Sequence, residues 1–174
     1  MKTLILTGIT ASLLALSSAA NASPFNYVDY TIGTISYDYS GVEDGDYSSL
    51  SASFETSIVP IIDLQSWDFD GGDSLWLGAG AYAEIGAYSH LYGIVHYVST
   101  DDDDEVSLTA GVRSTIADRL ELSAELQTLL TDSDANNSYT LSLGYYFTEN
   151  VSVAGEYIIS DNYSILGVGA RYSW

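Results

Sequence analysis

The sequence predicts an all-β protein, a transmembrane antiparallel up-and-down β-barrel closed by ten strands. Three observations lead to this fold class. Segments of about ten residues alternate between apolar and polar side chains, the pattern expected when one face of a strand meets lipid and the other a polar interior. Most acidic residues fall between these segments, and aromatic residues collect at their ends. Fifteen tyrosines also favour strands and membrane interfaces.

The N-terminal residues have the features of a secretory signal peptide. Lys2 precedes an apolar run from Leu4 to Leu16, and small residues end at Ala20-Asn21-Ala22. The apolar run is shorter than the ~20 residues that a membrane-spanning helix needs. We therefore expect a cleaved leader, residues 1–22, followed by a single barrel domain, residues 23–174.

Four segments have the most regular alternation and are the clearest strands. Along most of each segment, Leu, Val, Ala or an aromatic residue occupies every second position, with mostly polar residues or glycine between them. Successive side chains of a strand point to opposite faces, so each segment has one lipid-facing row and one interior row. The four segments are Val106–Thr115, Leu120–Leu130, Tyr139–Phe147 and Ser164–Trp174.

Six further segments complete a set of ten, an even number that returns both ends of the chain to one side of the membrane. The weakest is Ile61–Phe69, whose alternation breaks near Ser66 and Trp67, where a bulge is expected. If it merges with its neighbours, the alternative is a barrel of eight strands. The other five are Tyr27–Tyr37, Leu50–Ile58, Leu75–Tyr82, Leu91–Ser99 and Val151–Ile159.

The acidic residues sort by side on this strand map. Asp63, Glu84, Asp118 and Glu149 fall at the inner ends of strands. Five acidic residues remain within strands, and all of them can point inward, so no carboxylate has to face lipid. They are Asp29, Glu55, Glu121, Glu125 and Glu156. The others lie in or beside the outer loops: Asp38, Glu43, Asp44, Asp46, Asp68, Asp70, Asp73, Asp101, Asp102, Asp103, Asp104, Glu105, Asp132, Asp134 and Asp161.

Composition excludes several classes of partner and chemistry. The sequence has no cysteine, so disulfides, thiolate metal sites and a lipid-modified cysteine at the cleavage site are all excluded. Beyond Lys2, the basic residues are Arg113, Arg119 and Arg171, against 24 acidic residues. Because such an acidic chain repels polyanions, we expect no nucleic-acid partner.

Three motifs carry a family resemblance: the Ala20-Asn21-Ala22 cleavage site, the segment from Ser142 to Phe147 (SLGYYF), and the ending from Leu166 to Trp174 (LGVGARYSW). With them the chain resembles the small outer-membrane β-barrel superfamily that includes the OmpA transmembrane domain, OmpX and the short porin family proteins. The resemblance implies export through the general secretory pathway and residence in the outer membrane of a Gram-negative bacterium. It implies contact with outer-membrane lipid and lipopolysaccharide.

The resemblance also implies how the chain is assembled. Periplasmic chaperones and the barrel-assembly machinery would be partners during biogenesis, and Tyr172 and Trp174 would form the C-terminal assembly signal. Phenylalanine is the usual last residue of that signal, so Trp174 is a departure. Unlike in the OmpA family, we expect no peptidoglycan-binding domain after Trp174. The oligomeric state is left open.

Two arginines and three glutamates are expected to form a charge network inside the barrel. All five lie on the polar faces of their strands: Arg113, Arg171, Glu55, Glu125 and Glu156. Buried charges are tolerated when they are paired and hydrogen-bonded. Such a network either fills the interior or acts as a selectivity filter, and filling is the favoured interpretation. If water enters, the surplus of carboxylates would favour cations.

Three functions follow in order of preference. The first is a narrow or closed structural barrel with an acidic extracellular rim, because a barrel of about this size is nearly filled by side chains. The second is a small porin-like diffusion channel, mildly cation-selective. The third, an outer-membrane enzyme, is not expected. It would need a histidine beside a serine or an acid, and neither His90 nor His96 has an evident acidic partner.

The run Asp101, Asp102, Asp103 and Asp104 is the sharpest local motif. Oxygen-rich clusters suit Ca²⁺ or Mg²⁺, which would bridge the loops to lipopolysaccharide phosphates. The run lacks the interleaved spacing and central glycine of an EF-hand loop, so a solvated group of charges is the favoured interpretation. Weak binding of a divalent cation at these loops is the alternative, and no other cofactor is expected.

Overall fold

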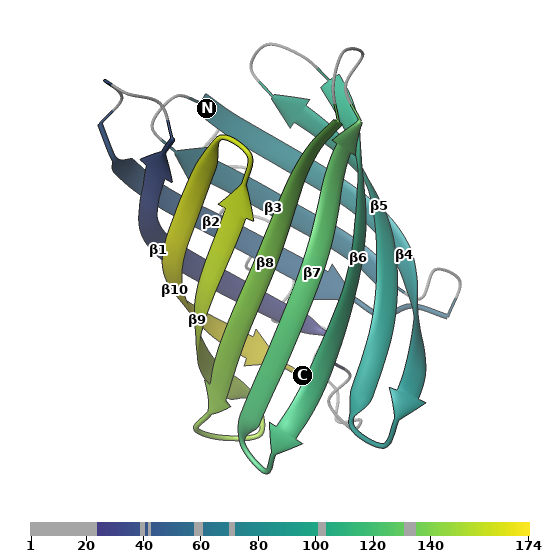
Figure 1. The fold of residues 1–174 in the computed structure, drawn as a ribbon. Helices are drawn as coiled ribbons and strands as arrows, with labels where there is room; N and C mark the ends of the chain where they lie inside the picture. The colour runs from purple at the N-terminus through teal and green to yellow at the C-terminus, as the bar shows by residue number, and fades with distance from the viewer. Residues whose placement is uncertain are drawn as a thin grey trace, which may run out of the picture.

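A computed structural model shows ten antiparallel strands that close into a barrel, which confirms the predicted fold class and strand number (Figure 1). The structure describes residues 24–38, 41, 43–57, 61–69, 72–100, 104–130 and 135–174. The predicted leader, residues 1–22, therefore lies outside the described residues. In the part of the chain that is described, no helix is long and apolar enough to cross a membrane.

Each strand pairs with its neighbours in sequence, and β1 pairs with β10 to close the sheet. All pairs are antiparallel, so every backbone ladder has a partner on both sides, which is the condition for a sheet to span lipid. The strands are β1 Tyr27–Tyr37, β2 Gly45–Phe54, β3 Ile61–Phe69, β4 Gly72–Gly86, β5 Ser89–Thr100, β6 Asp104–Ala117, β7 Leu120–Leu130, β8 Ala135–Tyr146, β9 Val151–Ser160 and β10 Tyr163–Ser173.

Several strand bounds differ from the prediction. β2 begins at Gly45, well before the predicted start at Leu50, because its first residues pair with the outer half of β1 although their side chains do not alternate in polarity. The expected bulge near Ser66 and Trp67 is wrong, since β3 pairs in continuous register with both neighbours. Register shifts occur instead at the inner ends of β4 and β6, next to tight turns.

The two faces of the wall have the polarity of a membrane barrel. Outward-facing Leu141 and Leu166 are 55% and 67% exposed, whereas inward-facing Ser107 and Arg113 are 0% and 4% exposed. A water-soluble sheet buries its apolar face instead, at a gain of roughly 25 cal/mol per Å². The apolar exterior of this closed sheet therefore requires lipid around it.

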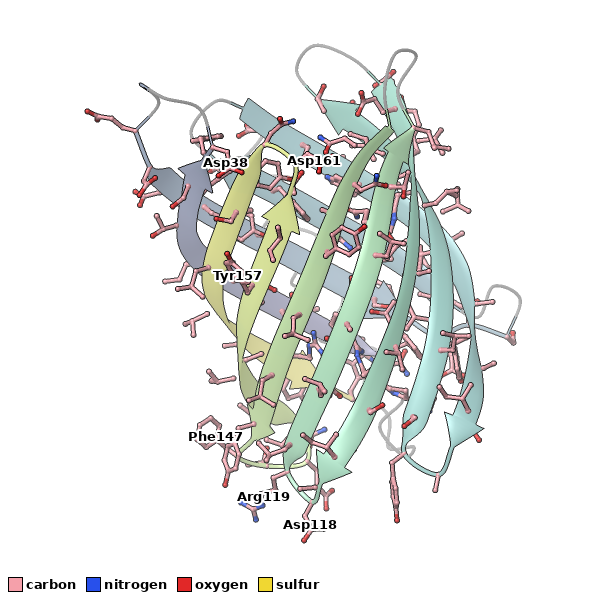
Figure 2. All side chains as sticks on the ribbon, viewed as in Figure 1. Asp38, Asp118, Arg119, Phe147, Tyr157 and Asp161 are labelled. Carbon is pink, nitrogen blue, oxygen red and sulfur yellow. The ribbon has the colours of Figure 1, made fainter. Side chains whose placement is uncertain are left out.

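The two ends of the barrel carry different connections (Figure 2). Asp38 and Asp161 lie at one end, here called the outer end, and Asp118, Arg119 and Phe147 at the other, the inner end. The outward-facing acids of β2, β3 and β4 (Asp46, Asp68 and Asp73) are exposed and lie within the first or last two residues of their strands. They thus lie at the outer end, clear of the apolar belt.

Two groups of buried apolar side chains fill the lumen. The inner cluster consists of Phe25, Ile61, Tyr92 and Ile94, with Tyr82 packed against it. The outer cluster consists of Ile35, Tyr47, Ile158 and Ile165, and Tyr37, Trp67 and Tyr163 pack against it. Phe25 precedes β1, so the chain enters the lumen from the inner end before it joins the wall.

Candidate functional site

Four charged side chains form a network in the inner half of the lumen, here called the arginine network. Nη2 of Arg171 lies 2.8 Å from Oδ2 of Asp29, and Nη1 lies 3.2 Å from Oε1 of Glu121. The same Glu121 oxygen lies 3.6 Å from Nε of Arg113. Glu121 is therefore the carboxylate that the two arginines share.

Strand register places these groups together. Asp29 of β1 faces Arg171 of β10 directly across the seam that closes the barrel. Ser51 of β2 donates a hydrogen bond of 2.5 Å to Oδ1 of Asp29, and Tyr146 of β8 donates one of 3.1 Å to Oε2 of Glu121. Both carboxylates thus have a neutral hydrogen-bond donor as well as a cation, which buried charges need in order to be stable.

Arg113 reaches across the lumen. Its strand, β6, is separated from β1 by four strands on either side of the closed sheet, so the two strands face each other across the barrel. The Arg113 guanidinium lies 5.0 Å from the centre of the Tyr27 ring on β1, a cation–π contact. It also donates a hydrogen bond to the backbone carbonyl of Pro24. One side chain thereby connects both walls of the barrel.

The structure gives the arginines different carboxylate partners from those expected. Asp29 and Glu121 pair with them, not Glu55, Glu125 or Glu156. Glu125 accepts a hydrogen bond of 2.5 Å from Tyr92. Glu55 lies just beyond the end of β2 and accepts a hydrogen bond of 2.8 Å from Tyr82. Glu156 packs over Gly167 on the neighbouring strand. Facing inward is a property of one strand, whereas pairing depends on where other strands bring their side chains.

A buried histidine–aspartate pair was missed from the sequence. Nε2 of His96 lies 3.0 Å from Oδ2 of Asp63, and both side chains are almost fully buried. Gln65 donates a hydrogen bond to Asp63, and Trp67 donates one to Gln65. Asp63 was expected at the inner rim, but its register on β3 turns it into the lumen. The two residues lie on β3 and β5, which are not adjacent, so spacing along the chain could not reveal the pair.

Glycines on the inner face make room for the rings that fill the lumen. Gly78 of β4 lies opposite His96 in the register, and a Cβ atom built on Gly78 would overlap the His96 ring. Gly111 of β6 lies opposite Tyr92, and a Cβ atom built on Gly111 would overlap the Tyr92 ring. Glycine allows a ring to pack closely against the backbone because it has no side chain. Elsewhere within a strand, glycine is conformationally unfavourable.

Replacing Gly78 with Ala should destabilise the barrel by about 1–3 kcal/mol, the usual effect of overpacking a core. The His96 ring would have to leave Asp63. Gly155 is the control, because it lies on the outer face of β9 and a Cβ there meets nothing within 4 Å. G155A should be neutral. Urea midpoints of the two variants in detergent micelles test this, and equal midpoints would show that the His96 ring is not held against Gly78.

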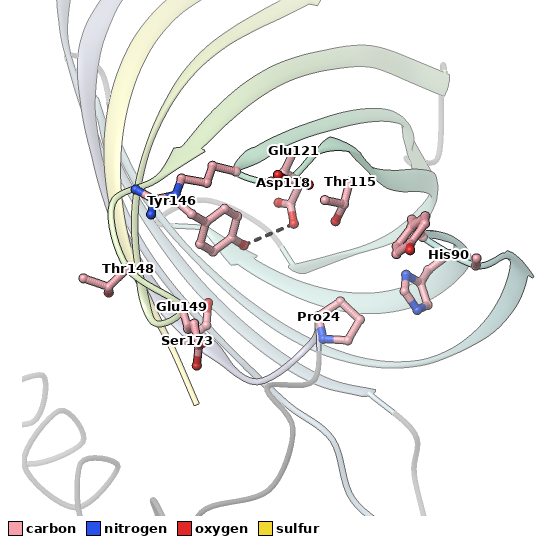
Figure 3. Close-up of a pocket in the computed structure, with 12 residues that line it drawn as sticks. Pro24, His90, Thr115, Asp118, Glu121, Tyr146, Thr148, Glu149 and Ser173 are labelled. Atoms are coloured by element: carbon pink, nitrogen blue, oxygen red, sulfur yellow. Dashed lines mark hydrogen bonds between the residues drawn. The ribbon is translucent and has the colours of Figure 1, made fainter.

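A pocket of about 740 Å³ opens at the inner end of the lumen. Figure 3 shows Pro24 and His90 on one side of this mouth and the hydrogen-bonded pair Tyr146 and Glu121 on the other. Exposed Asp118, Arg119 and Glu149 of the inner turns complete its rim. Through Glu121, the arginine network thus forms part of the wall of this open vestibule.

Of the acidic run, Asp101, Asp102 and Asp103 lie outside the described residues. Asp104 is exposed at the start of β6, where it makes a hydrogen bond with Tyr97. Among the described residues, no group of three or more histidine, aspartate or glutamate side chains could hold a metal ion. A cation site at these loops therefore stays a prediction.

The C-terminal residues have the orientation that alternation predicts. Tyr172 faces outward and is 40% exposed, while Ser173 faces inward and is 7% exposed. The Trp174 ring stacks on Tyr172 at 6.3 Å and contacts Phe54 at 5.9 Å, both centroid distances. The three rings form an aromatic group at the inner end of β10, in the place where an interfacial girdle is expected.

Comparison with known proteins identifies the fold. No protein-family model matches the sequence, and no curated protein is significantly similar to it. Solved structures do match: a KdgM porin with a TM-score of 0.59 at 12% identity, over 85% of this chain and 99% of that one. A NanC porin matches with a TM-score of 0.58 at 8% identity, over 84% of this chain and all of that one. The COG4313 outer membrane channel from Pseudomonas putida F1 scores 0.51 at 8% identity, over 91% of this chain and all of that one.

Together with the apolar exterior, this fold defines the class of protein. The chain is an integral outer-membrane β-barrel, and its ten strands form the same closed architecture as these porin structures. At such low identities the likeness concerns the fold alone. What the barrel does must be argued from its own interior.

Proposed function

We propose that this protein is a closed outer-membrane barrel, a structural element of the envelope that presents acidic loops at the cell surface. The observation that carries this proposal is the contact of Arg113 with Tyr27. It joins strands on opposite sides of the lumen at 5.0 Å and so narrows the lumen at this level. Arg171 adds a second bridge, from β10 to Glu121 of β7.

The lumen is also filled above this level. His96 and Ser107 are 1% and 0% exposed, and Ile165 of the outer cluster is 1% exposed. In a water-filled channel, inward-facing side chains would be wetted. Their burial supports an interior that is packed as a core, as in the smaller barrels whose side chains fill the inside.

A small diffusion channel is the second candidate, supported by the porin titles of the matched folds. One of these structures is titled a KdgM porin in complex with disordered oligogalacturonate, an acidic sugar polymer. The interior of the present chain does not suit such a ligand. Its inward-facing carboxylates outnumber its two inward arginines; they are Asp29, Asp63, Glu121, Glu125 and Glu156. If the lumen opened, it would favour cations over anions.

We do not propose an enzyme. The pair His96 and Asp63 has the residue types of an acid–base site, but substrate cannot reach side chains that are 1% exposed. We propose that the partners are lipid and lipopolysaccharide around the barrel, with chaperones and the assembly machinery acting on Tyr172 and Trp174. Membership of the OmpA and OmpX superfamily is part of this proposal and is supported by that C-terminal motif.

Conductance tests the closed barrel directly. Purified protein, shown to be folded by a change in gel mobility on boiling, is inserted into planar bilayers at neutral pH. We expect no stable current steps in KCl. Steady steps with a preference for K⁺ over Cl⁻ would instead establish the channel, and steps that favour Cl⁻ would contradict the charge argument as well.

A further inference from the structure

We propose that the segment Pro24–Asn26 is a removable plug, which closes the inner half of the lumen against water from the inner end. This inference rests on the proposed closed barrel and adds the place where water enters its inner half. The plug is the chain's own N-terminal segment, inserted into the lumen beside the arginine network.

Phe25 is the side chain that fills the opening. It is 2% exposed although it belongs to no strand. Its ring stacks on Tyr82 at a centroid distance of 4.5 Å and meets the edges of Tyr92 and His90 at 5.5 and 6.1 Å. Ile61 and Ile94 complete the inner cluster around it. These residues come from β3, β4 and β5, and the Arg113 guanidinium of the arginine network lies 5.5 Å from the centre of the Phe25 ring.

Three hydrogen bonds from outside the segment hold it. Arg113 donates to the Pro24 carbonyl, the Glu55 amide donates to Oδ1 of Asn26 at 2.7 Å, and the Trp174 amide donates to the Asn26 carbonyl at 3.1 Å. Two of the three are at Asn26, which places a hinge there. None of the strand pairings includes Phe25, so the ring can leave without breaking the sheet.

Phe25 separates the vestibule at the inner end from buried polar groups deeper in the lumen. Toward the inner end is the vestibule of about 740 Å³, which Pro24 borders. Beyond the inner cluster lie His96 and Ser107, which face each other in the register of β5 and β6. Nδ1 of His96 and Oγ of Ser107 are buried without a hydrogen-bond partner among the described residues. Withdrawal of Phe25 would join the vestibule to a polar level that water can satisfy.

The predicted cleavage site makes such movement feasible. Cleavage after Ala22 would leave Ser23 as the residue before Pro24, so the plug would lie next to a free chain end. A segment of this kind can swing about Asn26 while β1 remains paired with β2 and β10.

Thiol labelling tests the plug, because the chain has no cysteine of its own. Two probes are introduced singly into the protein in micelles: I94C behind the plug and I165C in the outer cluster. Each is combined with F25S, with the conservative F25L, or with F147S, a control that removes an exposed phenylalanine from the turn between β8 and β9. A charged, water-soluble thiol reagent is then added, and the labelling rate is followed.

We expect F25S to raise the labelling rate of I94C at least about tenfold, because accessibility follows the population of the open state. F25L and F147S should leave that rate close to its original value, and I165C should stay protected in every variant. Unchanged labelling of I94C in F25S would overturn the plug. Equal acceleration of both probes would also overturn it, since Phe25 would then be part of a single core. Conductance of the unmodified protein is scored separately and bears on the closed barrel alone.

Discussion

Replacing Glu121 with Ala should cost the barrel about 3–5 kcal/mol of folding free energy, the loss expected when one partner of a buried ion pair is removed. Glu121 is the carboxylate shared by Arg113 and Arg171, and its side chain is 13% exposed. Asp29 would still neutralise Arg171, whereas Arg113 would lose the carboxylate with which it is paired among the described residues.

The urea concentration that abolishes the folded gel band measures this loss. The control is E149A, which removes a carboxylate from the exposed turn between β8 and β9 and should stay within about 0.5 kcal/mol of the original protein. E121Q should fall between the two, because an amide still accepts from Tyr146 but carries no charge. A midpoint for E121A equal to that of E149A would mean that the network contributes nothing to folding.

Introducing arginine at Leu141 should lower folding stability by about 2–4 kcal/mol, the cost of a cation on the lipid face near the bilayer midplane. Leu141 is 55% exposed and lies within an outward row bounded by Tyr139 and Tyr145. Leu141 lies between these two aromatic residues with Leu143 beside it, in the apolar row of the lipid-facing wall.

The neighbouring position provides the matched control. Thr140 faces the lumen and lies directly opposite Glu125 in the register of β7 and β8. Arginine introduced there gains a carboxylate partner and a polar surrounding, so T140R should lose much less stability than L141R. Refolding into lipid vesicles under a urea series gives both values. The reverse order would mean that the two faces of β8 are assigned the wrong way round.

Sequence alone determined which side chains face inward. The alternation of Val106 to Thr115 places Arg113 on the polar face, and the alternation of Ser164 to Trp174 does the same for Arg171. The structure confirms both, because the period of two is a local property of an extended strand. The strand number followed from the same pattern. The bounds of strands such as β2 were poorly predicted, where polar residues continue the ladder above the lipid, and the bulge expected in β3 was wrong.

Tertiary structure decided which inward side chains meet. Glu121 and Glu125 both face the lumen on β7, yet one joins the arginine network and the other accepts from Tyr92. The pair His96 and Asp63 and the insertion of Phe25 likewise leave no periodic trace in the sequence. The reason is physical: alternation is set by two neighbouring residues, whereas a contact across a closed barrel depends on the register of every strand between its partners.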